Sequence, residues 1–193
     1  MEFIEKQRKE YLQREAATAA KNETSQVTAR SVDPTLTVKS RPKMLLIEFC
    51  CNSNSTIGQS SGKFNMFVLR ITEKDDATKM STINSALEVM SSYEFVGIHG
   101  SLPCTGWSCW WHMILATSSG DRRTEMEKRQ SNLRQTSQLL VAHFLILARK
   151  VAEKSGSISF EWPRHCAGWL QQYIQELLLE LHMSLISVDA MND

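Results

Sequence analysis

The chain has 193 residues, of which 42% are hydrophobic and 22% charged, and its formal net charge is +1 at pH 7. This length suits one domain with an extension, and it is sufficient to bury a hydrophobic core. A net charge near zero gives no overall field that would attract the chain to nucleic acid or to a membrane surface. No apolar run approaches the roughly 20 residues that a membrane-spanning helix requires, so we expect no membrane partner.

The first forty residues differ in composition from those that follow. Residues 3–20 are mostly good helix formers with few apolar positions, and residues 21–41 are rich in Ser, Thr, Asn and Gln. We predict a mobile, partly helical extension over residues 1–41, which is either a solvated tail or a partner-binding arm. Residues 42–193 then form the folded domain, either complete or truncated at its carboxyl end.

The amino terminus and the cysteines indicate the compartment. Residues 1–10 are charged and lack the apolar core of a signal peptide. The five cysteines are odd in number, and two of them are adjacent, which is not typical of a disulfide framework. We therefore expect an intracellular protein, nuclear or cytoplasmic, whose cysteines stay reduced.

From residue 44 onward, strand and helix patterns alternate along the chain. Short apolar runs predict strands at 44–51, 67–72, 95–99 and 157–162, and a further strand that begins at 185. Apolar residues at helical spacing predict helices at 81–90, 124–154 and 168–183. This alternation predicts an α/β domain with a mostly parallel sheet of about five strands and helices on both faces.

The residues just after each predicted strand are expected to meet at one edge of the sheet, where open α/β domains bind ligands. Acidic residues at 73–76 suit the ribose hydroxyls of an adenosine-containing ligand, and the polar segment 52–58 suits its charged end. Cys104, directly after Pro103, and Glu161 are expected to face each other across neighbouring strand ends. The pair would combine a thiol with a carboxyl group.

Two of these segments resemble the core of the cytosine-5 DNA methyltransferases. The loop is Leu102-Pro103-Cys104-Thr105-Gly106-Trp107-Ser108, where that family has Pro-Pro-Cys-Gln-x-x-Ser. The strand end is Phe160-Glu161-Trp162-Pro163, where the family has Glu-Asn-Val. Ile47-Glu48-Phe49-Cys50-Cys51-Asn52 stands at the cofactor strand, and Asp76-Ala77-Thr78 is similar to an acidic-Ile-Thr element. The resemblance covers about residues 44–189 in order.

The resemblance implies a Rossmann-like methyltransferase that uses S-adenosylmethionine and has DNA as its partner. Cys104 would then attack carbon 6 of the target cytosine, and Glu161 would hold the base and assist its activation. The residues implied for the cofactor are Glu48, Cys50, Asn52 and Asp76. The residues implied for the substrate are Pro103, Thr105, Ser108 and Arg164.

A closer likeness is to open reading frames that lie beside mobile elements in dinoflagellate-type genomes. They share a Leu-Ile-Glu-Phe-Cys-Cys start, an Arg-x-Thr-x-x-x-Asp strand end, a Pro-Cys-Thr-Gly loop and a Glu-Trp-Pro strand with this chain. No activity of that group transfers to this chain.

The chain also departs from the methyltransferase pattern. The segment after the first strand has no glycine before Gly58, Trp162-Pro163 replaces Asn-Val, and no target-recognition domain follows Glu161 before Asp193. Two hypotheses therefore stand. The domain is a cytosine-5-type methyltransferase, active or degenerate, or it is a non-catalytic binding or assembly module of mobile-element origin that retains the fold. A cysteine hydrolase that uses His99 or His112 is a third, weaker one.

Each candidate residue also has a structural interpretation. Cys104 needs a helix amino terminus or a cationic neighbour such as His99 or Arg164 to become a thiolate, and otherwise is a buried structural cysteine. Glu161 is either a buried catalytic acid or a residue that caps the turn or pairs with Arg164. The tryptophans at 107, 110 and 111 either stack on a base or belong to the core. The spacing of Cys104, Cys109 and His112 lacks a second ligand pair, so we predict no metal site.

Overall fold

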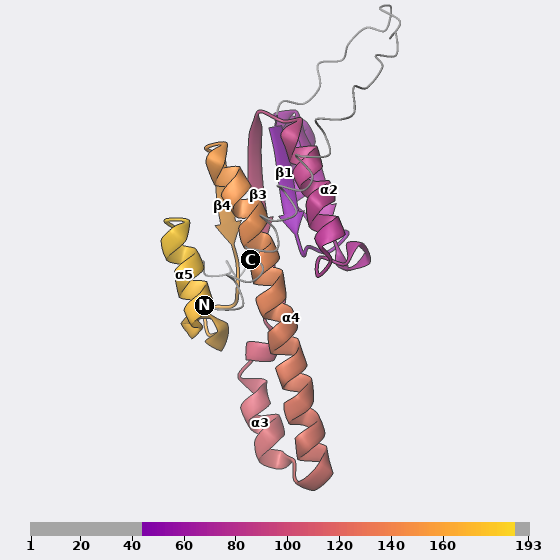
Figure 1. Cartoon of the computed structure of the whole chain (residues 1–193), viewed down its shortest axis with the longest axis vertical. Coiled ribbons are helices and arrows are strands. Elements are labelled where there is room, and N and C mark those ends of the chain that lie inside the picture. The colour runs from indigo at the N-terminus through magenta and orange to yellow at the C-terminus, as the bar shows by residue number, and fades with distance from the viewer. Residues whose placement is uncertain (1–43, 188–193) are drawn as a thin grey trace, which may run out of the picture. The chain divides into compact units, whose positions relative to one another are not determined.

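The computed structural model describes residues 44–187, so the extension predicted over residues 1–41 lies outside the described part. The chain divides into two units, Met1–Pro42 and Lys43–Asp193, and every described residue belongs to the second. Within it, parallel strands form one sheet with the order β2-β1-β3-β4 (Figure 1). The domain is therefore of the predicted α/β class.

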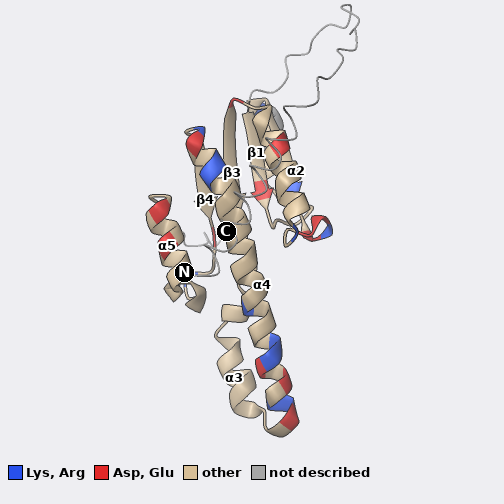
Figure 2. Ribbon diagram, in the orientation of Figure 1, with Lys and Arg blue, Asp and Glu red and all other residues tan. Residues whose placement is uncertain are grey.

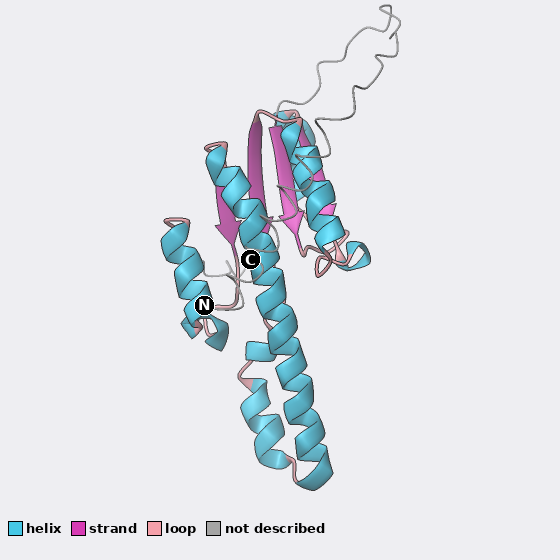
Figure 3. Cartoon of the chain, in the orientation of Figure 1, coloured by secondary structure: helices cyan, strands magenta, loops and turns pink. Residues whose placement is uncertain are grey.

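The described strands are β1 (Met44–Phe49), β2 (Met66–Ile71), β3 (Phe95–Gly100) and β4 (Ser157–Phe160). The α-helices are α2 (Met80–Ser91), α3 (Trp110–Thr117), α4 (Gly120–Glu153) and α5 (Gln172–Glu180). Short 3₁₀ helices are η1 (Ile57–Phe64), η2 (Glu73–Asp75), η3 (Thr105–Trp107) and η4 (Ala167–Leu170). Figure 3 shows how these helices and strands alternate. The four internal strand predictions and the first two helix predictions are confirmed.

The carboxyl-terminal predictions are partly wrong. The helix predicted over 168–183 is divided into η4 and α5 because Gln171 between them is extended, with φ −74° and ψ 134°. The strand predicted from residue 185 is absent at 185–187, the part of it that the structure describes. His182 turns the chain with φ 51° after α5, and Leu185 and Ile186 are exposed rather than paired with the sheet.

One face of the sheet is apolar and carries the hydrophobic core. Alternate strand residues such as Ile47, Phe49 and Ile98 point to this face and are almost fully buried. Figure 1 shows α2 and α4 against the sheet, and the Phe144 ring of α4 lies 5.9 Å from the Phe49 ring. Gly100 permits this packing, since a Cβ there would lie 2.7 Å from the Phe144 ring.

The opposite face carries a row of polar side chains in register across the four strands. Glu48 of β1 pairs with Arg70 of β2 on one side and with His99 of β3 on the other, and His99 pairs with Ser159 of β4. We call these four residues the polar row. Polar side chains can remain in contact with water, so this face needs no apolar layer of helices over it. Strands that are buried on both faces are apolar on both.

Residues 44–187 place only η1 as a helical cover on this polar face, so the predicted second layer of helices is much reduced there. A Cβ at Gly58 of η1 would lie 2.8 Å from the Glu48 carboxylate, which shows how closely η1 sits on β1. The long helix α4 packs against β3, β4, α2, α3 and α5. Charged residues are concentrated in the half of α4 that runs beside α3 (Figure 2). Among the described helices, none is both long and apolar enough to cross a membrane.

Candidate functional site

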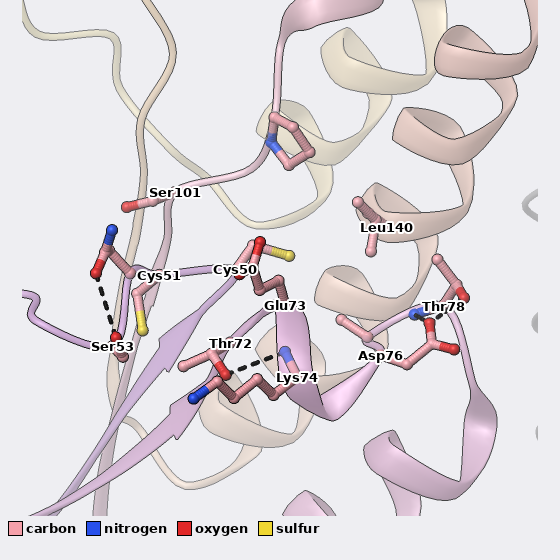
Figure 4. Close-up of a pocket in the computed structure, with 13 residues that line it drawn as sticks. Cys50, Cys51, Ser53, Thr72, Glu73, Lys74, Asp76, Thr78, Ser101 and Leu140 are labelled. Carbon is pink, nitrogen blue, oxygen red and sulfur yellow. Dashed lines mark hydrogen bonds between the residues drawn. The ribbon is translucent and has the colours of Figure 1, made fainter.

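A cavity of about 540 Å³ lies at the carboxyl ends of β1, β2 and β3 (Figure 4). The chain passes from β1 to β2 on one side and later adds β3 on the other, so this is the point where the strand order reverses. Ligands of open α/β sheets bind at such a point. The lining residues are Cys50, Cys51, Asn52, Ser53, Thr72, Glu73, Lys74, Asp76, Ala77, Thr78, Ser101, Pro103 and Leu140.

Two cysteines and an asparagine form the β1 side of the cavity. Cys50 has the left-handed backbone conformation, with φ 59°, and turns the chain at the end of the strand. Burial raises the pKa of Cys50 to about 12, and it also raises the pKa of Cys51, so both thiols are protonated at neutral pH. The Asn52 Oδ1 accepts from the Asn54 backbone N–H at 2.9 Å. Among residues 44–187, the Asn52 amide nitrogen has no hydrogen-bond partner.

Acidic residues form the β2 side, and they differ in what they bind. The Asp75 carboxylate accepts from the Thr72 backbone N–H and hydroxyl, both at 2.8 Å. Thr78 and then Lys79 bind the Asp76 carboxylate and lower its pKa, and Figure 4 shows this carboxylate turned toward Thr78. Glu73 lines the cavity and has no hydrogen-bond or ion-pair partner among residues 44–187. Glu73 is therefore the acid available to a ligand.

The predicted cofactor residues do not all reach the cavity. Cys50, Asn52 and Asp76 line it, whereas Glu48 is fully buried beneath η1 and does not. The Glu48 carboxylate accepts from Arg70 Nε at 2.8 Å, from the Ser55 hydroxyl and from the Gly58 backbone N–H at 3.3 Å. Its bonds hold η1 and β2 against β1, which is a structural role.

Cys104 follows β3 but is not among the residues that line the cavity, although Pro103 is. The loop after it is held on α4: Gly106 lies against the α4 backbone, and Arg134 Nε donates to the Gly106 carbonyl at 3.0 Å. The Cys104 thiol neighbours that of Cys166, whose pKa is raised by burial and further by Cys104.

The remaining predicted substrate residues belong to the same loop or to the surface, and among them only Pro103 lines the cavity. The Thr105 carbonyl accepts from Trp111 Nε1 at 2.7 Å, and the Ser108 hydroxyl accepts from a backbone N–H at 3.4 Å. Arg164 is exposed. Trp107 and Trp111 are buried, as the core interpretation expects, whereas Trp110 is 63% exposed.

Glu161 meets Ser101 and His99 at the end of β3. The Ser101 hydroxyl donates to Glu161 Oε1 at 2.7 Å and lies 3.1 Å from His99 Nε2. His99 Nε2 is 3.6 Å from the same carboxylate oxygen, and His99 Nδ1 is 2.8 Å from the Ser159 hydroxyl. The sequence does not point to Ser101 or Ser159, because the register between β3 and β4 that brings them to His99 is not visible in it.

Within residues 44–187, no three His, Cys, Asp or Glu side chains are grouped as a metal site would require. Comparisons with protein-family models, with curated protein sequences and with solved structures gave no match.

Proposed function

We propose that the domain binds S-adenosylmethionine in the cavity at the carboxyl ends of β1, β2 and β3, and that it is a Rossmann-like methyltransferase-type domain. The observation that carries this proposal is the position of the cavity at the reversal of strand order. Its volume of about 540 Å³ falls in the range of sites for small ligands and cofactors.

The lining side chains suit the parts of this cofactor. Glu73 offers a carboxylate acceptor for the two ribose hydroxyls, and Leu140, Pro103 and Ala77 offer apolar contact for the adenine ring. The amide nitrogen of Asn52 offers a donor for the carboxylate of the methionine part. The loop after β1 has no glycine before Gly58, and Cys50 makes the turn there with a left-handed backbone conformation. Glycine would make the same turn at a lower conformational cost.

Calorimetric titration of the whole chain with S-adenosylmethionine tests the proposal. Binding is expected, and Glu73→Gln is expected to weaken it about tenfold, because a hydrogen bond to a charged acceptor is lost. Glu88→Gln is the matched control, since Glu88 is an exposed residue of α2 outside the cavity. If millimolar S-adenosylmethionine gives no heat of binding, the proposal is wrong.

Cytosine-5 methyl transfer is the finer form of the proposal, and it rests on the resemblance of the Pro103-Cys104 loop. In this form Cys104 leaves Cys166 and attacks a cytosine that enters beside Pro103. DNA that contains 5-fluorocytosine would trap the adduct on Cys104 when S-adenosylmethionine is present. Cys104→Ser should abolish the adduct, and Cys109→Ser should retain it because Cys109 is an exposed thiol elsewhere. Cofactor binding without any adduct removes the cytosine-5 form alone.

A non-catalytic assembly module is the second candidate, and the surface of α3 favours it. Trp110, Met113 and Ile114 are exposed on one side of a helix that carries no charged residue. Exposed apolar side chains that adjoin one another mark protein contacts. If the chain self-associates through α3, sedimentation velocity will show a larger species that Trp110→Ala with Met113→Ala reduces to a monomer. His112→Ala, on the same helix, should leave that species unchanged.

A further inference from the structure

Four polar side chains of β3, β4 and the segments after them form a connected hydrogen-bonded group, which we call the Ser101 cluster: His99, Ser101, Ser159 and Glu161. The register explains it. His99 pairs with Ser159, and the Glu161 backbone N–H donates to the Gly100 carbonyl, which brings Glu161 beside Ser101. Because alternate residues of a strand point to the same face, His99 and Ser101 share a face with their two partners.

The hydroxyl of Ser101 is the centre of this cluster. It lies 3.1 Å from His99 Nε2 and 2.7 Å from Glu161 Oε1, so two proton acceptors are within hydrogen-bond distance of one hydroxyl. Ser101 lines the cavity, and the His99 side chain behind it is only 14% exposed. Ser101 therefore connects the cavity to an imidazole that is largely shielded from water.

The other imidazole nitrogen is also held. His99 Nδ1 lies 2.8 Å from the Ser159 hydroxyl, which is itself within 3.5 Å of the Ile98 carbonyl. When Ser159 donates to that carbonyl, its oxygen accepts the Nδ1–H of His99. When the Ser101 hydroxyl turns from Glu161 Oε1 to donate to His99 Nε2, the Nε2 lone pair accepts that proton, and this is the tautomer that a general base requires.

We propose that Ser101 is the nucleophile of an acyl-transfer site, with His99 as its general base, and that the substrate class is a carboxylic ester bound in the cavity. Nucleophile, base and orienting group follow the arrangement by which a serine hydroxyl is activated on unrelated folds. Glu161 contributes by charge: its carboxylate is 3.6 Å from Nε2 and stabilises the imidazolium that forms. Ser159 is a positioning residue.

The reaction has two steps. Ser101 Oγ bonds to the ester carbonyl carbon while its proton passes to His99 Nε2. The bond between that carbon and the leaving oxygen breaks, and the leaving alcohol takes the proton from Nε2. Water then bonds to the acyl carbon and its proton passes to Nε2. The bond between the acyl carbon and Ser101 Oγ breaks, Oγ takes the proton from Nε2, and the carboxylic acid is released. Asn52 lines the same cavity, and its amide nitrogen would donate to the oxyanion in this proposal.

This proposal does not depend on cofactor binding, and a fluorophosphonate probe tests it directly on the full chain. The probe phosphonylates activated serines with loss of fluoride. Intact-mass measurement should show one adduct per chain, and peptide mapping should place it on Ser101. Ser101→Ala should abolish it, and His99→Ala should slow labelling at least about 100-fold, the usual contribution of a general base.

Control variants separate chemistry from folding. Ser85→Ala, an exposed serine of α2, and His165→Ala, an exposed histidine, should both label at the wild-type rate. Ser159→Ala should slow labelling about tenfold, and Ser159→Thr should restore it because the hydroxyl returns. The variants' urea midpoints should match the wild type. No adduct on Ser101 of the wild-type chain, or an adduct whose rate is unchanged in His99→Ala, overturns the proposal.

Discussion

The two faces of the sheet are made by the same strands and use them for different purposes. On one face, side chains such as Phe49 and Ile98 are buried against α4, and the Phe144 ring fills the space over Gly100. On the other, the polar row and the Ser101 cluster are joined by hydrogen bonds, and η1 covers only the Glu48 end. The difference indicates that the first face supplies stability and the second supplies reactive groups.

The largest effect on stability is expected from removing a buried side chain that packs on the apolar face. Phe144→Ala should lower the free energy of unfolding by about 3–5 kcal/mol, because a fully buried ring is replaced by a cavity. Urea denaturation measures it. Trp110→Ala removes a larger aromatic group that is 63% exposed, and it should cost no more than about 0.5 kcal/mol. Equal losses in the two variants would contradict burial as the source of the loss in Phe144→Ala.

Glu48 is a residue of the polar face that does contribute to the stability of the domain. Glu48→Gln should cost about 2 kcal/mol, since it removes the charge that pairs with Arg70 and weakens the bonds that hold η1. The Arg70 side chain is 32% exposed, so water lessens the cost of leaving it unpaired. Glu73→Gln is the matched control and should leave the urea midpoint unchanged, since Glu73 has no partner among residues 44–187. A loss in Glu73→Gln equal to that in Glu48→Gln would refute the distinction.

A pH dependence should come from His143 in the helical layer over the apolar face. Burial lowers the pKa of His143 below its ordinary value of 6.5, while its Nδ1–H donates to the Ala77 carbonyl at 2.8 Å. Below pH 6.5 the unfolded chain therefore binds a proton that the folded chain does not, and stability falls as the pH is lowered.

Urea midpoints between pH 5 and pH 8 should show this loss as a slope confined to the acid side, about pH 5 to 6.5. His143→Gln should reduce that slope, and His165→Gln, at an exposed position, should retain it. A slope that is the same in His143→Gln and in the wild type would show that another group is responsible.

A small effect on stability is expected within the Ser101 cluster. Ser159→Ala removes one hydrogen bond at an exposed residue and should change the free energy of unfolding by less than about 1 kcal/mol. The same variant should clearly slow the labelling of Ser101. A large loss of stability in Ser159→Ala would mean that the cluster serves the fold instead.

The strands and the long helix could be predicted because their signals are local. The run 44–49 is apolar except for Glu48, and the stripe of Leu140, Phe144, Leu147 and Val151 has helical spacing. The sequence also contains a pattern that indicates the reduced layer of helices on the polar face. Phe95–Gly100 and Ser157–Phe160 alternate between apolar and small or polar residues, which is typical of strands covered on one face.

The candidate site was harder to predict because it depends on directions and registers. Glu48 stands near a strand end, as a cofactor ligand would, but its side chain points beneath η1. Cys104 stands in the expected loop, but the contact of Gly106 with α4 holds the following turn away from the cavity. Glu161 was expected to meet Cys104, and it meets Ser101, because the β3–β4 register sets residue 101 beside residue 161.

One consequence follows from the contacts of α4. Arg134 holds the loop after Pro103, His143 holds the Ala77 turn, and Leu140 lies between them in the cavity wall. Two opposite sides of the cavity are thus attached to a single continuous helix, at points about 13 Å apart along its axis at 1.5 Å per residue. Because a single helix fixes the distance between these two sides, the width of the cavity should be constant. The domain should therefore select ligands by length and should not adapt to longer ones.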